Sequence, residues 1–159
     1  MPYLFHRGSR YWVHASNVVV ILAGTVQTFW TFLSYQDVEW TYVRFISMLT
    51  IPGILYFIAS MLVPDDPKLT ESWEKHYYDR RIQYFSAILG WAILTLINTT
   101  FVLGMPLTHP SRGVQLSVVG IGLCGLISDR PVVHKLLVGV GLGALLAIGL
   151  IVLLVPAVD

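Results

Sequence analysis

Long apolar stretches alternate with short polar ones along the whole chain. A helix needs about 20 mostly apolar residues to cross the hydrocarbon core of a bilayer. The pattern therefore predicts an all-α protein, a polytopic transmembrane helical bundle of about five spans. The predicted spans are Val13–Leu33, Tyr42–Val63, Ile82–Leu103, Val114–Ser128 and Leu136–Val155. We expect residues 1–159 to form a single transmembrane helical domain, because the spans leave no length for a soluble one.

The fourth stretch, Val114–Ser128, is shorter than the others. At about 1.5 Å of rise per residue it covers roughly 22 Å, less than a hydrocarbon core of about 30 Å. Three interpretations are open: a locally thinned bilayer, an upstream extension of the helix through Pro106–Pro110, or a re-entrant segment. We favour a full crossing, because hydrophobic mismatch costs only fractions of a kcal/mol per Å.

The longest polar stretch, Pro64–Arg81, separates the second and third spans. Within it, Leu69, Trp73, His76 and Tyr77 recur at helical spacing and would share one helix face. This arrangement predicts a short interfacial helix between spans 2 and 3, lying along the membrane surface before the chain turns into the third span.

The distribution of Lys and Arg predicts the orientation of the chain. With five crossings and a cytoplasmic N-terminus, eight of the ten basic residues lie inside, and only Arg44 and Arg112 lie outside. If the fourth stretch did not cross, the division would fall to six against four. Cytoplasmic loops carry an excess of Lys and Arg. We therefore expect a multi-pass protein of the bacterial cytoplasmic (inner) membrane, with its C-terminus outside.

Composition agrees with a lipid environment. Hydrophobic residues make up 55% of the chain and charged residues 12%, about half the charged fraction of soluble domains. A net charge of +1 argues against a nucleic-acid partner, and a single cysteine, Cys124, excludes a disulfide within the chain. The expected partners are the lipid bilayer and either other membrane subunits or further copies of this chain.

Polar residues inside the spans are uncharged. No Asp, Glu, Lys or Arg lies in the middle of a span, which argues against a pump or a proton-coupled carrier. Gln27 and Thr28 lie in the first span, and Asn98 and Thr99 in the third. These side chains either hydrogen-bond between helices, at about 0.6 kcal/mol each, or line a polar pocket between the two spans near the outer leaflet. We favour hydrogen bonding, the common role of such residues.

Small residues mark candidate helix-packing positions. Gly139-x-x-x-Gly143 lies in the fifth stretch and Gly120 in the fourth. Glycines let helix backbones approach closely in lipid. The motif would pack the fourth span on the fifth, or one protomer on another, and we favour packing within the chain.

Histidines give the sharpest candidate site. His14, His76 and His134 come from three different elements and map to the cytoplasmic boundary. Together they are candidates for binding a cofactor, as ligands of a metal or of haem iron. Their wide spacing favours the alternative that each is an interfacial, hydrogen-bonded histidine. No phosphate-binding loop, zinc-binding helix or nucleophile motif occurs, so we predict no catalytic residue and assign no cofactor.

Several short runs, in their order along the chain, resemble a family of uncharacterised bacterial multi-span integral membrane proteins. They are Tyr11-Trp12-Val13-His14, Phe29-Trp30-Thr31-Phe32, Val38-Glu39-Trp40-Thr41, Leu62-Val63-Pro64-Asp65, His76-Tyr77-Tyr78-Asp79-Arg80-Arg81, Asn98-Thr99 and Ser128-Asp129-Arg130 to His134. The resemblance implies the same architecture but no activity. Similar histidine positions recur in the family, which adds interest to His14, His76 and His134.

Members of that family begin with an additional helix that carries an intramembrane Thr-His pair. The resemblance implies that this chain lacks the helix, and that a site lined by it is absent or is completed by another protein. The leading functional prediction is a non-catalytic integral membrane protein, a small accessory or scaffold subunit of a larger membrane assembly. The alternatives are a cofactor- or metal-binding protein that uses the histidines, and a carrier for a small neutral solute. No inverted repeat supports the carrier.

Overall fold

The computed structural model describes residues 11–32, 35, 38–63 and 72–154. Within these ranges the long elements are all helices, and no strand occurs. They are α1 (Trp12–Phe32), α2 (Tyr42–Leu62), α3 (Trp73–Ile97), the π-helix η3 (Asn98–Val102), α4 (Ser111–Ile127) and α5 (Pro131–Leu154). The predicted all-α helical bundle is confirmed. The predicted span ends Leu33 and Val155, and Leu69 of the predicted interfacial helix, lie outside the described residues.

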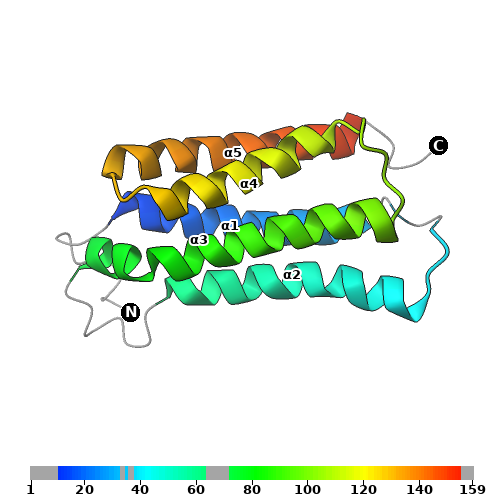
Figure 1. Cartoon of the computed structure of the whole chain (residues 1–159), viewed down its shortest axis with the longest axis horizontal. Coiled ribbons are helices and arrows are strands. Elements are labelled where there is room, and N and C mark those ends of the chain that lie inside the picture. The colour runs from blue at the N-terminus through cyan, green and yellow to red at the C-terminus, as the bar shows by residue number, and fades with distance from the viewer. Residues whose placement is uncertain (1–10, 33–34, 36–37, 64–71, 155–159) are drawn as a thin grey trace.

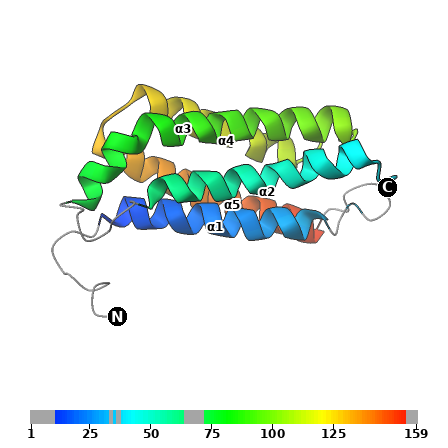
Figure 2. The same cartoon turned by 90° about the horizontal axis from the view of Figure 1, so that it is seen from below.

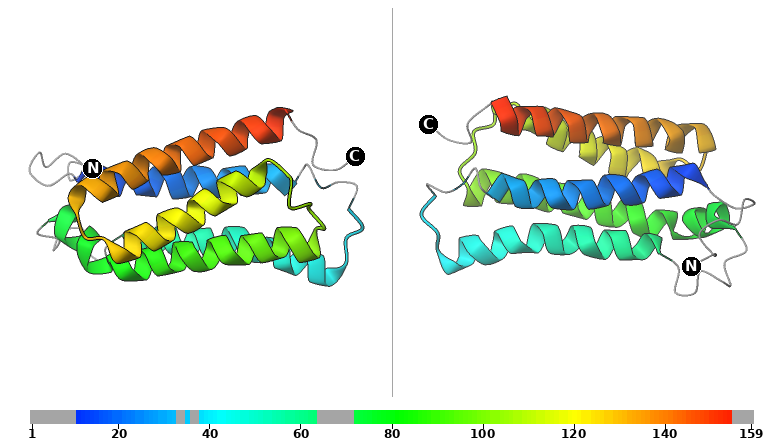
Figure 3. Two further views of the ribbon diagram at one scale, coloured as in Figure 1. Left: turned by 45° about the horizontal axis from the view of Figure 1, so that its top comes forward. Right: turned by 180° about the vertical axis from the view of Figure 1, so that it is seen from behind.

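The five α-helices close into a ring. α1 packs on α2, α2 on α3, α3 on α4, α4 on α5, and α5 again on α1. Successive helices run in opposite directions (Figures 1 and 3). We call the end where α1, α3 and α5 begin the Tyr77 end, and the end where α2 and α4 begin the Arg112 end. A ring of five helices encloses a central space, and the side chains on the inner faces of the helices line it.

Large apolar side chains cover the outside of the bundle. Val26 is 70% exposed, Tyr56 74%, Leu146 71% and Leu153 73%. Four helices are long and apolar enough to cross a membrane: α1, α2, α3 with η3, and α5. Apolar surface on this scale is rare on soluble monomers and suits a membrane-spanning protein.

α4 is the shortest member of the ring, with 17 residues. It begins at Ser111, three residues before the predicted start, and at about 1.5 Å per residue it is roughly 25 Å long. The helix lies between α3 and α5 and carries the chain from the Arg112 end to the Tyr77 end (Figure 1). A segment that connects opposite ends of the bundle differs from a re-entrant one, which would return to its starting side.

The interfacial helix expected before the third span is not a separate element. From Trp73 onward its residues form the first turns of α3, which bend relative to the rest of the helix (Figure 2). Ser72 caps the helix by accepting a hydrogen bond from the Lys75 backbone N–H at 3.4 Å. No proline occurs between Ser72 and Ile97, so nothing in the sequence forces a break and the backbone hydrogen bonds continue.

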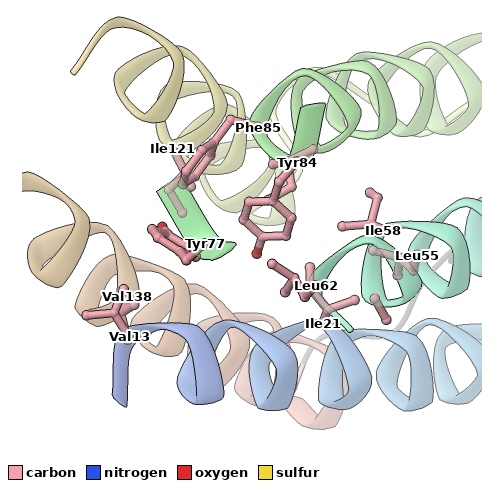
Figure 4. Close-up of a cluster of buried hydrophobic side chains, with 12 residues drawn as sticks. Val13, Ile21, Leu55, Ile58, Leu62, Tyr77, Tyr84, Phe85, Ile121 and Val138 are labelled. Atoms are coloured by element: carbon pink, nitrogen blue, oxygen red, sulfur yellow. The ribbon is translucent and has the colours of Figure 1, made fainter. Parts of the chain in front are cut away.

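A core of aromatic and aliphatic side chains joins the helices toward the Tyr77 end (Figure 4). Tyr77, Tyr84 and Phe85 from α3 are each 1% exposed. Around them lie aliphatic side chains from the other four helices. They are Val13 and Ile21, Leu55, Ile58 and Leu62, Ile121, and Val138.

Gly120, Gly139 and Gly143 do not mark a close approach of helices within this chain, and their packing against a second protomer stays a prediction. A Cβ added at Gly120, Gly139 or Gly143 would meet no atom within 4 Å. The close approach is instead between α4 and α3, where a Cβ at Gly122 would lie 2.9 Å from Cβ of Leu89. The Gly139-x-x-x-Gly143 spacing identifies a small-residue stripe, but it does not tell which side of α5 faces the ring.

Candidate functional site

A cavity of about 230 Å³ lies inside the ring and is lined by all five helices. Its middle is apolar, with side chains from every helix, such as Ile21, Leu55, Ile88, Ile121 and Val138. An apolar cavity of about 150 Å³ holds benzene. By the same proportion, this cavity has room for a molecule of roughly nine non-hydrogen atoms.

The cavity becomes polar toward the Arg112 end. We call this part the polar end of the cavity. Its side chains come from α1, α3, η3, α4 and the connection before α4. They are Gln27, Thr28, Thr31, Thr95, Asn98, Thr99, His109, Ser111 and Gln115. The four residues predicted as polar intramembrane positions, Gln27, Thr28, Asn98 and Thr99, are all among them.

Both sequence interpretations of those four residues describe part of the structure. Asn98 joins helices, because its Nδ2 donates to the Ser47 carbonyl of α2 at 3.0 Å. Thr28 donates to the Gly24 carbonyl of its own helix at 2.8 Å. Thr99 likewise donates to the Thr95 carbonyl at 2.9 Å, which leaves its oxygen able to accept from outside the helix.

The end of α3 widens into a π-turn at this point. In η3 the Leu103 N–H donates to the Asn98 carbonyl at 3.1 Å, and beyond it the Met105 N–H reaches the Thr99 carbonyl at 2.9 Å. Single π-turns within helices are frequent at functional sites. Gly104 follows at φ 69°, a left-handed conformation that favours glycine, and turns the chain back toward α4.

Arg112 lies in this turn with its side chain buried, 6% exposed. Its Nη1 donates to Thr99 Oγ1 and to Gln115 Oε1, both at 2.8 Å. Its Nη2 donates to the Met105 carbonyl at 2.6 Å, and its Nε to the Pro106 carbonyl at 3.3 Å. These four acceptors are neutral, and no carboxylate of residues 11–32, 35, 38–63 and 72–154 forms an ion pair with the guanidinium.

Tyr35 is a further neighbour of this charge. Its side chain is 3% exposed and lines the cavity. Burial raises the pKa of the Tyr35 phenol, and the positive charge of Arg112 opposes that shift. The phenol therefore lies within electrostatic reach of Arg112 and stays protonated at neutral pH, so it does not neutralise the guanidinium.

Two polar atoms at the polar end have no hydrogen-bond partner in the described part of the chain. They are Thr95 Oγ1 and His109 Nε2, both buried. His109 Nδ1 accepts from the Ser111 backbone N–H at 3.3 Å, so a neutral His109 ring carries its proton on Nε2. A buried donor without an acceptor is unfavourable, so His109 offers a hydrogen bond to a molecule in the cavity.

The opposite boundary of the cavity is formed by Tyr84 and Asn17. The Tyr84 hydroxyl donates to Asn17 Oδ1 at 3.0 Å, and Asn17 Nδ2 donates to the Val13 carbonyl at 2.8 Å. These groups are satisfied within the protein. The two ends of the cavity therefore differ chemically: among the described lining residues, the unpartnered buried atoms lie at the Arg112 end. Arg81 Nη1 and His76 Nε2, buried without a described partner at the Tyr77 end of the bundle, do not line the cavity.

The predicted histidine site is only partly assembled. His14 and His76 are neighbours, with ring centroids 6.2 Å apart. His134 lies against Tyr77 instead and uses both ring nitrogens, Nδ1 with the Tyr77 hydroxyl at 3.0 Å and Nε2 with the Ser128 carbonyl at 2.9 Å. Among the residues that the structure describes, no three His, Cys, Asp or Glu side chains are placed to hold a metal ion.

Hydrogen bonding explains these positions better than ligation. His14 Nε2 lies 2.6 Å from the Leu62 carbonyl, which ties α1 to the end of α2. A histidine that ligates a metal needs one ring nitrogen free of such contacts. Of these three histidines, only His76 retains a buried nitrogen, Nε2, with no partner among the described residues.

The sequence interpretation missed the residues that distinguish the polar end. Arg112 was counted only as an outer-loop charge, and His109 and Gln115 were not singled out as site residues. The available signal was the position of Arg112 close to the start of an apolar helix. Its burial depends on η3 and Gly104, which bring the Met105 and Pro106 carbonyls to it.

The chain was compared with models of protein families, with curated proteins and with solved structures. None of the three comparisons gives a significant match. The resemblance to bacterial multi-span membrane proteins therefore stays a prediction, and the site has to be interpreted from its own geometry.

Proposed function

We propose that this chain is a non-catalytic integral membrane protein that binds a small, mostly apolar molecule inside its helical ring. The observation that carries the proposal is the cavity of about 230 Å³, apolar along its middle, with the unpartnered Thr95 and His109 atoms at one end. Ligand pockets are typically apolar with a few convergent polar groups. A molecule from the lipid phase matches this lining.

Photolabelling tests the proposal directly. The probe is an octanol analogue that carries a diazirine, close to the size the cavity admits. After irradiation in detergent, peptide mass spectrometry should find label on inward-facing residues such as Ile88 and Leu145. Lipid-facing residues such as Leu146 give the internal reference for non-specific labelling.

A matched pair of α5 variants locates the binding. Ala144 lines the cavity and Ala147 is not one of its lining residues. Ala144→Phe should abolish inward labelling, because the ring occupies the cavity, whereas Ala147→Phe should leave it intact. Equal inward labelling of both folded variants would remove the proposal.

The orientation proposed for this protein has the Tyr77 end in the bacterial cytoplasm. Support comes from the excess of basic residues in the predicted inner loops. It also comes from the alternating helix directions, because α1, α3 and α5 begin at one end of the bundle (Figure 1). In a Cys124→Ser background, Glu74→Cys should be protected from a membrane-impermeant thiol reagent in intact cells. Thr108→Cys should be labelled, and the reverse result would overturn the orientation. Both positions are exposed.

The earlier functional predictions stay open to separate measurements. An accessory or scaffold subunit should co-purify with a partner or with further copies in mild detergent, and a protein found only as a lone monomer would contradict that role. A haem or metal protein should show a visible absorption band or bound metal after purification.

A further inference from the structure

We infer that the molecule bound in the cavity is an amphipathic anion, whose carboxylate or similar head group approaches Arg112 at the polar end while its apolar part fills the middle. The inference rests on the proposed function and names the class of ligand. Three observations carry it: the buried charge of Arg112, the neutral character of the partners it has among the described residues, and the His109 donor that has no acceptor among them.

An isolated buried charge is costly. Taking a guanidinium out of water is compensated in proteins by an opposite charge, together with hydrogen bonds to the remaining N–H donors. Arg112 is 6% exposed, and its four hydrogen bonds go to a hydroxyl, a side-chain amide and two backbone carbonyls. These dipoles orient the guanidinium, and no carboxylate in the described part of the chain balances its charge.

The side chains of two hydrogen-bond partners separate the Arg112 guanidinium from the cavity. Thr99 and Gln115, which accept its Nη1 hydrogen bonds, line the cavity themselves. A guanidinium has five N–H donors, and four hydrogen bonds are found, so one Nη2 donor has no acceptor in the part of the chain described. An anionic head group at this position would supply both the acceptor and the missing charge.

His109 and Thr95 complete a set of hydrogen-bond donors. His109 Nε2 and Thr95 Oγ1 are buried without partners among the residues that the structure describes, and both residues line the cavity. A carboxylate has two oxygens with about four acceptor positions, which suits this number of donors. A neutral alcohol would satisfy one or two of them and leave the charge unbalanced. An ammonium head would add a second positive charge beside Arg112.

Three probes of equal chain length test the head group: octanoate, 1-octanol and octylammonium. Each competes with the diazirine label for the cavity of the full chain in a neutral detergent at about pH 8, where a carboxylate is ionised. We expect octanoate to compete about tenfold more strongly than octanol, a ratio typical of a charge-assisted hydrogen bond. Octylammonium should compete more weakly than octanol.

Variants assign the preference to Arg112. Arg112→Gln should bring octanoate and octanol to within about twofold of each other. Arg112→Lys should keep part of the preference because it keeps the charge. Arg44→Gln is the matched control, since Arg44 lies at the same end, bonded to the Glu39 carbonyl and outside the cavity lining. It should leave the preference unchanged.

The outcomes separate the inference from the proposed function. Equal competition by octanoate and octanol in the wild type overturns the anionic ligand and leaves cavity binding intact. A preference for octanoate that persists in folded Arg112→Gln assigns the charge recognition elsewhere and also overturns the inference. Absence of inward labelling removes the proposed function itself. If Arg112→Gln does not fold, the wild-type ratio and Arg112→Lys decide.

Discussion

The hydrogen bond between Tyr77 and His134 offers a quantitative test of how the Tyr77 end is held together. Tyr77 is 1% exposed and His134 0%. His134 Nε2 must donate to the Ser128 carbonyl, because a carbonyl only accepts. In the neutral ring Nδ1 is then an acceptor, and the Tyr77 hydroxyl donates to it at 3.0 Å. Tyr77→Phe removes that donor and leaves Nδ1 buried without a partner.

The expected loss of stability follows from the burial of both groups. An unsatisfied buried acceptor costs about 1–3 kcal/mol, while interhelical hydrogen bonds in membrane proteins average about 0.6 kcal/mol and reach about 1.7 kcal/mol. Because neither side chain is accessible, the effect should lie near the top of the second range, at about 1.5 kcal/mol. This free energy corresponds to a change of about tenfold in the unfolding equilibrium constant.

Reversible unfolding in mixed micelles of increasing SDS fraction, followed by tryptophan fluorescence, measures this difference. Tyr78→Phe is the control, because its hydroxyl contacts the Tyr11 hydroxyl at 3.1 Å in a partly exposed position. Water or lipid head groups replace that contact, so its loss should cost less than about 0.5 kcal/mol. Tyr77→Phe within about 0.3 kcal/mol of the wild type, or less harmful than Tyr78→Phe, would refute this account of the His134 site.

Two further predictions concern glycines and use the same unfolding assay. Gly122→Ala should destabilise the folded protein by about 1–3 kcal/mol, because its Cβ would meet Leu89 at 2.9 Å. A Cβ at Gly120 would meet no atom within 4 Å. Gly120→Ala should therefore be neutral or stabilise the protein by up to about 1 kcal/mol. Equal effects would contradict the assigned α3–α4 contact. Gly104→Ala should cost about 1 kcal/mol, because φ is 69° there, and an unchanged stability would count against this turn geometry.

Hydrophobic length is sufficient to predict the helices, because a membrane helix satisfies its backbone hydrogen bonds within itself. Three predicted spans, Val13–Leu33, Tyr42–Val63 and Leu136–Val155, match α1, α2 and α5 apart from residues at their ends. The third span begins earlier than its apolar part, at Trp73. Its charged first turns continue the helix because each added residue gains a backbone hydrogen bond and Tyr77 packs into the core.

Side-chain chemistry alone is less informative about contacts. Gln27, Thr28, Asn98 and Thr99 were predicted together as polar positions inside the spans, and all four line one cavity. His14, His76 and His134 are all potential metal ligands, but they do not come together in one site. Where each side chain lies depends on the rotation of its own helix. Knowing that three histidines map to the same membrane boundary does not tell how each helix is rotated about its own axis.

The sequence by itself determined the class of protein: its apolar stretches require helices that bury their own backbone groups, and its paucity of charge points to lipid. Only the tertiary structure decided that five helices close into a ring, that α4 meets α3 through Gly122, and that the Arg112 charge lies beside a cavity. The physical reason is that helix formation is a local property of the chain. Which face of each helix turns inward is set by packing among all five helices at once.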